Sequence, residues 1–149
     1  MPDMKGSRTE KNLLASFAGE CQASVRCGFY AKQARKEGYV QIAAIFEEAS
    51  EQERAHARRL QKLMGEAEAE VSLALRSSLG GTTLENLEEA AGCEAREATE
   101  DYPAHAAAAR EEGFAEAAAV FAALAVAEAG HRERFLALAG NIRQGRVVA

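Results

Sequence analysis

Apolar residues recur every three or four positions along four stretches of this chain, and that spacing predicts four amphipathic helices. The stretches run from about residue 7 to 36, 39 to 64, 82 to 112 and 114 to 139. Gly38, Gly65 and Gly140 follow three of them, and a glycine at such a position favours the end of a helix. Pro103 falls within the third stretch, where it predicts a kink.

The second half of the chain repeats the first. A shift of 75 residues takes Gly38 onto Gly113 and Phe46 onto Phe121, so each half is predicted to form one helical hairpin. The hairpins cover about residues 7–65 and 82–140 of a single domain, residues 1–149. Short turns make the helices of each hairpin antiparallel, and a long connection joins the second helix to the third. This pattern predicts an all-α fold, the ferritin-like antiparallel four-helix bundle with one long crossover.

One Glu-x-x-His pair interrupts the apolar stripe of the second helix, and another interrupts that of the fourth. The 75-residue shift superposes the two pairs, which are Glu53 with His56 and Glu128 with His131. The first and third helices add Glu20 and Glu94, which correspond after a slip of one residue. The third stripe continues through either Glu97 or Ala98. At ~1.5 Å per residue, the glutamates on the four helices lie roughly 22–29 Å from their hairpin turns. The sequence therefore predicts one buried layer of carboxylates and imidazoles.

Such a layer needs cations, because each unpaired buried ion costs several kcal/mol even after relaxation. The inward stripes hold no matching set of Lys or Arg side chains, so we expect two metal ions. Carboxylate-rich sites with two His favour iron or manganese, or a mixed pair, over zinc. A lone Glu-x-x-His pair is usually a solvated helix face. Two such pairs at matching repeat positions, with single Glu residues on the other helices, are typical of di-iron carboxylate bundles.

Charge and composition narrow the classes of protein further. The net charge of −5 disfavours nucleic acid as a partner, since such proteins normally present a basic face. No run approaches the ~20 apolar residues of a membrane span, and residues 1–11 are too polar for a signal peptide. Three cysteines without a CxxC pair, Cys21, Cys27 and Cys93, indicate free thiols in a reducing compartment. We therefore expect a cytoplasmic protein that binds no membrane.

Several segments together resemble the rubrerythrin family, and the resemblance covers nearly the whole chain. They are residues 5–12 (KGSRTEKN), 17–20 (FAGE), 51–56 (EQERAH), 102–103 (YP), 110–114 (REEGF) and 125–131 (AVAEAGH). The resemblance implies that two iron ions are bound by Glu20, Glu53, His56, Glu94, Glu97, Glu128 and His131. It also implies that one iron moves between His56 in the reduced state and Glu97 in the oxidised state. A ferric ion gains more from an anionic oxygen, which supports that exchange.

The activity that the resemblance implies is a non-haem di-iron peroxidase, which reduces hydrogen peroxide to water and so protects against oxidative stress. We expect Glu97 to shuttle protons and Tyr102 to supply a hydroxyl donor near the irons. On the alternative interpretation, Glu97 is a solvated carboxylate one turn from Glu94. Cys27 stands where the family usually carries a second tyrosine. Its thiol is either a small core residue or a group that peroxide can oxidise.

Partners follow from the resemblance as well. Rubrerythrins carry a C-terminal rubredoxin-like domain with paired CxxC knuckles, and this sequence ends about where that domain would begin. We therefore expect an external electron donor, such as a rubredoxin-like protein, unless the sequence is part of a longer chain. We also expect a homodimer, in which the long crossover would allow hairpins to be exchanged. Ferrous iron oxidation with storage, oxygen reduction, and a metal-free helical interaction module are the alternatives.

Overall fold

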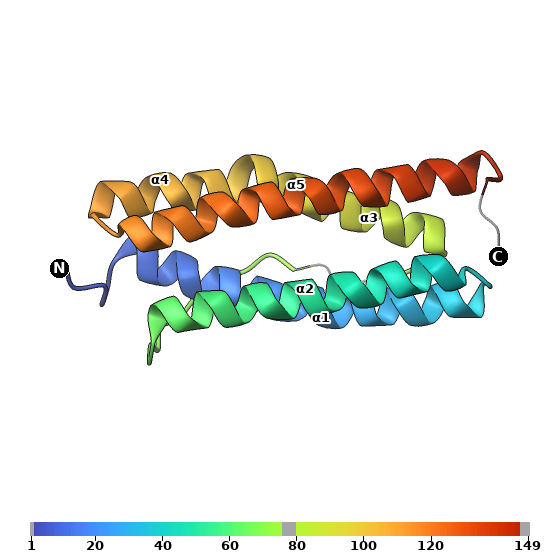
Figure 1. Cartoon of the computed structure of the whole chain (residues 1–149). Helices are drawn as coiled ribbons and strands as arrows, with labels where there is room; N and C mark the ends of the chain where they lie inside the picture. Colours follow the sequence, from blue (N-terminus) through green and yellow to red (C-terminus); the bar gives the residue numbers. More distant parts are fainter. Residues whose placement is uncertain (1, 76–79, 147–149) are drawn as a thin grey trace.

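A computed structural model describes residues 2–75 and 80–146 of the chain (Figure 1). The first hairpin consists of α1 (Arg8–Lys36) and α2 (Val40–Met64). The second consists of α3 (Thr83–Arg96), η1 (Glu97–Asp101), α4 (Tyr102–Glu112) and α5 (Ala115–Arg143). The two hairpins lie along each other, and the crossover after α2 runs back along the bundle (Figure 1). The predicted all-α four-helix bundle with a long second connection is confirmed.

Each hairpin turn holds the start of the other hairpin. The Glu112 carboxylate accepts a hydrogen bond from the backbone N–H of Thr9 at 2.8 Å, at the start of α1. In the same way, Glu37 accepts one from the backbone N–H of Thr83 at 2.7 Å, at the start of α3. A carboxylate at a helix N-terminus satisfies free N–H groups and complements the helix dipole. The internal repeat is therefore also a repeat of contacts between the hairpins.

Two apolar clusters fill the bundle, with the polar layer between them. One cluster, nearer the turn after α1, is built around Tyr30, Phe46 and Phe135. The other includes Leu13 and Phe121 and lies toward the opposite end. Close packing on both sides leaves the polar layer out of bulk water, so its charges interact strongly.

The third predicted helix is interrupted, and the irregular turn is not at Pro103 itself. Residues Glu97–Asp101 form a π-helix, and Pro103 follows in the first turn of α4. This π turn accounts for the slip in the repeat. Glu20 and Glu94 correspond at a shift of 74, whereas the glycines at the hairpin turns correspond at 75. One extra residue in the second half widens a helical turn at this point.

The final helix is longer than the sequence predicts. It continues through Gly140 to Arg143, and Gly145, with a φ of 65°, follows it instead. Gly140 has no positive φ, so it is an ordinary helical residue whose lack of a side chain does not end the helix. Among the described residues, no helix combines the length and apolar character that crossing a membrane requires.

Candidate metal centre

Six polar side chains from four helices meet in the middle of the bundle. Their nitrogen and oxygen atoms form two sets, in each of which all atoms lie within 4.8 Å of one another. The first ligand group is Glu20, Glu53, His56 and Glu128; the second is Glu53, Glu94, Glu128 and His131. Both groups therefore share Glu53 of α2 and Glu128 of α5. Shared carboxylates between two such sets are the arrangement in which two metal ions are bridged.

The imidazoles lie across from the partner hairpin's carboxylates. His56 Nδ1 lies 2.9 Å from Glu128 Oε1, and His131 Nδ1 lies 2.9 Å from Glu53 Oε1. The unshared carboxylates are farther away: Glu20 Oε1 is 3.8 Å from His56 Nδ1, and Glu94 Oε1 is 3.5 Å from His131 Nδ1. The arrangement follows the two-fold repeat of the sequence.

The layer is buried and poorly satisfied by protein hydrogen bonds. Glu20, Glu53 and Glu128 have relative exposures of 2%, 1% and 0%. Within residues 2–75 and 80–146, the buried atoms without a hydrogen-bond partner include Glu20 Oε2, both Oε atoms of Glu53 and Glu128, Glu94 Oε2, and Nδ1 of both His56 and His131. So many buried polar atoms without partners in one place are costly unless another group, such as a metal ion, satisfies them. Hard carboxylate oxygens with two imidazole nitrogens fit iron or manganese.

In the metal-free protein, the same crowding shifts the ionisation of the imidazoles and carboxylates. Burial lowers the pKa of His56, but the carboxylates of Glu128, Glu20 and Glu53 outweigh it and raise that pKa to about 11. Burial likewise lowers the pKa of His131, but the carboxylates of Glu128 and Glu53 outweigh it and raise that pKa to about 10. Burial also raises the pKa of Glu20 well above its ordinary value. Protons therefore compensate part of the charge in the absence of metal, and a metal ion has to displace them.

Hydrogen bonds from outside the layer orient one member of each ligand group. The Tyr102 hydroxyl donates to Glu20 Oε1 in the first group. Burial, followed by the carboxylates of Glu20 and Glu97, raises the pKa of Tyr102, so the hydroxyl keeps its proton. In the second group, His131 Nε2 lies 2.6 Å from Gln52 Oε1. Nothing in the sequence points to Gln52, because a glutamine beside a metal ligand carries no signal until α2 and α5 are packed together.

Cys27 occupies the repeat position of Tyr102, because the shift of 75 takes one onto the other. Its side chain is buried, and burial followed by the charge of Glu53 raises the pKa of the thiol to about 12. A thiol in that state is protonated and a poor nucleophile. The structure therefore favours the interpretation of Cys27 as a small core residue.

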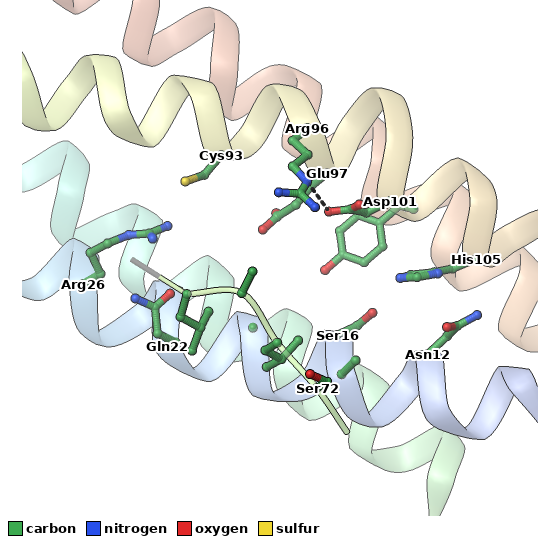
Figure 2. A pocket seen from close by; sticks show the side chains of 16 residues that line it. Asn12, Ser16, Gln22, Arg26, Ser72, Cys93, Arg96, Glu97, Asp101 and His105 are labelled. Carbon is green, nitrogen blue, oxygen red and sulfur yellow. Dashed lines mark ion pairs between the residues drawn. The ribbon is translucent and has the colours of Figure 1, made fainter. Parts of the chain in front are cut away.

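A cavity of about 440 Å³ adjoins the layer on the side of α1, η1 and α4 (Figure 2). Glu97 and Tyr102 line it, with Arg26 and His105 among its other walls and the crossover residues 72–75 along one side. Glu97 is not part of either ligand group. Burial, followed by the charge of Glu53, raises the pKa of Glu97 to about 7. The predicted seventh ligand thus lies at the boundary between the cavity and the layer.

Comparisons with known proteins agree with this centre. The sequence profile of the family named Rubrerythrin matches residues 11–139. The chain is 49% identical over 147 residues to rubrerythrin from Nitratidesulfovibrio vulgaris, which covers 99% of this chain and 77% of that protein. It is 47% identical over 144 residues to rubrerythrin from Porphyromonas gingivalis, covering 97% and 72%. A fully reduced, all-ferrous nigerythrin structure has a TM-score of 0.80 at 32% identity, covering 95% of this chain and 73% of that one.

Proposed function

The chain belongs to the rubrerythrin family, and from that membership and its metal centre we propose that it is a di-iron peroxide reductase. The reaction takes hydrogen peroxide, two electrons and two protons to two molecules of water. The observation that supports this proposal is the pair of ligand groups joined by Glu53 and Glu128, next to a cavity at Glu97 and Tyr102. Two iron ions, when bound there, supply the two electrons and polarise the oxygen–oxygen bond.

The six side chains of the two ligand groups are the ones we propose to hold iron. Glu53 and Glu128 would contribute to both ion sites, while Glu20 with His56 and Glu94 with His131 would each serve one of them. Glu97 would be the seventh ligand, in place of His56 when the irons are oxidised. Its place beside the layer, and the absence of a carboxylate at its repeat position Ala23, make that exchange specific to the first group.

Two protons must reach the peroxide oxygens. Glu97 lies on the cavity wall, where a carboxyl group can pass protons inward from water. Tyr102 holds its proton against Glu20 Oε1, at the boundary of the cavity and the layer. Glu97 is therefore the proton carrier in this proposal, and Tyr102 orients Glu20 and keeps a hydroxyl proton directed toward the centre.

The electrons come from a separate donor, for which a rubredoxin-like protein is the natural candidate within this proposal. We also propose that the protein acts as a homodimer. Both proposals are tested by adding a reduced rubredoxin and measuring turnover, and by sedimentation of the iron-loaded protein.

Peroxide titration of the anaerobically loaded protein tests the activity. We expect about two ferrous ions per chain, as in di-iron bundles, and their complete oxidation by one equivalent of hydrogen peroxide. Oxidation by dissolved oxygen should be much slower. Uptake of many ions per chain under air would instead indicate storage, and faster oxidation by oxygen than by peroxide would indicate an oxygen reductase.

A matched pair of variants isolates the role of Glu97. Glu97→Gln should retain both irons and react with peroxide about 10²-fold more slowly, the usual loss when a positioned proton donor is removed. Glu100→Gln changes an exposed carboxylate of the same π turn and should react as the wild type does. Equal rates for the two variants would exclude Glu97 as the proton carrier.

A further inference from the structure

The two imidazoles of the centre differ in what holds their outer ring nitrogen. His131 Nε2 lies 2.6 Å from the side-chain oxygen of Gln52, across the contact between α5 and α2. Within the described part of the chain, His56 has no hydrogen bond from its Nε2. Since both rings present Nδ1 to the carboxylates, the difference lies outside the ligand groups.

The orientation of the Gln52 amide is set by a chain of contacts. Its nitrogen donates to Glu48 Oε1 at 3.2 Å, one turn earlier on α2. Arg134 of α5 in turn donates to Glu48 Oε2 at 3.1 Å. The amide oxygen is therefore the atom that faces His131, and an amide oxygen only accepts hydrogen bonds. When the ring is neutral, as metal binding requires, its one proton is on Nε2 against the amide oxygen, which leaves the lone pair on Nδ1, toward the ligand group.

The repeat shows that this chain of contacts exists on one side only. The 75-residue shift takes Gln52 onto Ala127 and Glu48 onto Ala123. Neither alanine has a polar side chain, so α5 has no side-chain acceptor at this position for His56, whereas α2 presents the Gln52 oxygen to His131. The ligands of the two halves match, but their outer hydrogen bonds do not.

We propose that Gln52 is a positioning residue that holds His131 in one tautomer and one orientation, making it the fixed imidazole ligand of the centre. The repeat position of Gln52 is Ala127, so His56 lacks the matching restraint and is free to leave its ligand group. This inference rests on the proposed metal centre. It adds a physical reason why any exchange of imidazole for carboxylate occurs on the His56 side. Loss of an outer partner of a ligating imidazole typically costs 10–100-fold in metal affinity.

Zinc release tests the inference without redox chemistry. The zinc-loaded wild type, mixed with an excess of a coloured chelator, should release its metal in two phases. Gln52→Ala should accelerate the slower phase by about 10–100-fold and leave the faster one unchanged. Gln52→Glu, which keeps an acceptor toward His131, should retain the slow phase. Ala127→Gln, which offers His56 a matching amide, should slow the faster phase.

A spectroscopic signature separates positioning from a general loosening of the fold. In the zinc-loaded wild type, one imidazole N–H proton should exchange slowly with water in the nuclear magnetic resonance spectrum. Gln52→Ala should lose that signal while keeping its helical circular dichroism. Gln33→Ala is the matched control, because Gln33 makes the same contact one turn along its helix, to Glu37 at 3.1 Å, away from the centre.

The outcomes distinguish a failure of the role proposed for Gln52 from a failure of the metal centre itself. Unchanged release and an unchanged N–H signal in Gln52→Ala, with two zinc ions bound per chain, would overturn the role of Gln52 and leave the metal centre intact. A wild type that binds neither zinc nor iron would overturn the metal centre, and this inference with it.

Discussion

The first and second ligand groups contain the same kinds of side chain, three glutamates and one histidine each, yet they have different surroundings. In the first group, Tyr102 donates to the unshared carboxylate Glu20, and no described residue holds the imidazole of His56 from outside. In the second group the imidazole is held, by Gln52, while the thiol of Cys27 stands where a second tyrosine hydroxyl would be. Each group has one outer restraint, on a different kind of ligand.

That difference teaches where a duplicated site diverges. The shared glutamates, Glu53 and Glu128, cannot change in one half without damaging both groups, because each belongs to both. One step farther out, Gln52 lies against His131 of the second group and Tyr102 donates to Glu20 of the first. Their repeat positions carry Ala127 and Cys27, so the two halves differ there. The cavity beside Glu97 lies next to Tyr102, on the Glu20 side of the centre. Substrate access and ligand exchange are therefore expected at the first group.

Removing a shared carboxylate should have the largest effect, because it damages both groups. Glu53→Ala is expected to bind neither iron and to lose peroxide reduction entirely, whereas Glu94→Ala should retain part of its metal. Iron content per chain after anaerobic loading and desalting measures this. Glu51→Ala is the control, since Glu51 is exposed and forms an ion pair with Arg54 at 3.3 Å, away from the ligand groups. Full iron binding by Glu53→Ala would contradict the bridging role.

Removing the Tyr102 hydroxyl should affect the first group alone. Tyr102→Phe is expected to slow peroxide reduction about 10–100-fold, the usual consequence of freeing an oriented ligand, while both irons remain bound. Stopped-flow oxidation of the ferrous protein gives the rate. Tyr30→Phe is a matched control, because the buried Tyr30 hydroxyl has no hydrogen-bond partner among the described residues and its ring lies in an apolar cluster. A rate for Tyr102→Phe equal to that of the control would remove the hydroxyl from the mechanism.

The pH dependence of metal binding should show both groups losing protons. Raised pKa values of about 11 for His56 and about 10 for His131 mean that both rings are protonated at pH 7 in the metal-free protein. Affinity should therefore increase with pH, by up to about tenfold per unit for each metal, since each ion displaces a proton. Zinc titration calorimetry at pH 6.5 and 7.5, in buffers of different ionisation enthalpy, counts the protons. Binding that releases none would show that the rings are neutral beforehand.

The raised pKa values of His56 and His131 also make the stability of the metal-free protein depend on pH. A group whose pKa is higher in the folded state stabilises the fold below its unfolded value, here about 6.5. That contribution is lost as the pH rises toward 10 and 11. Thermal unfolding of the metal-free protein should accordingly occur at lower temperature as the pH is raised above 6.5. A stability that rises over this range would contradict the charge state assigned to the imidazoles.

The smallest effect is expected from shortening the second half to match the first. Deletion of Ala98 removes the extra residue of η1 and should leave a regular helix with Glu94 and Tyr102 still facing inward. Deletion of Ala23 from the regular α1 should instead turn every residue after it by about 100° and unfold the bundle. Circular dichroism and iron content of the two variants compare the halves directly. Unfolding of both would show that the π turn is not a simple insertion.

The sequence predicted the helices well where local chemistry decides them. The predicted starts near residues 7 and 82 are confirmed, since the side chains of Ser7 and Thr82 cap α1 and α3, and Gly38 ends the first helix with a φ of 89°. The predicted end of the fourth helix at Gly140 was wrong, because α5 continues past that glycine with ordinary helical geometry. The sequence located the irregularity of the third helix at Pro103, whereas the extra residue is accommodated between Glu97 and Asp101. Proline restricts the chain locally, but the position of a π turn depends on which side chains must face the core.

The repeated Glu-x-x-His pairs, together with Glu20 and Glu94 on the other two helices, were sufficient to predict six polar side chains in one layer, because helical periodicity and similar distances from the hairpin turns depend on sequence alone. The sequence did not show which carboxylate lies beside which imidazole, because His56 meets Glu128 and His131 meets Glu53 only when the hairpins pack together. The Gln52 contact to His131 and the cavity beside Glu97 belong to the same class. Spacing along a helix determines the face on which a residue lies; contacts between helices depend on how those faces are turned toward each other, and only the tertiary structure decides that.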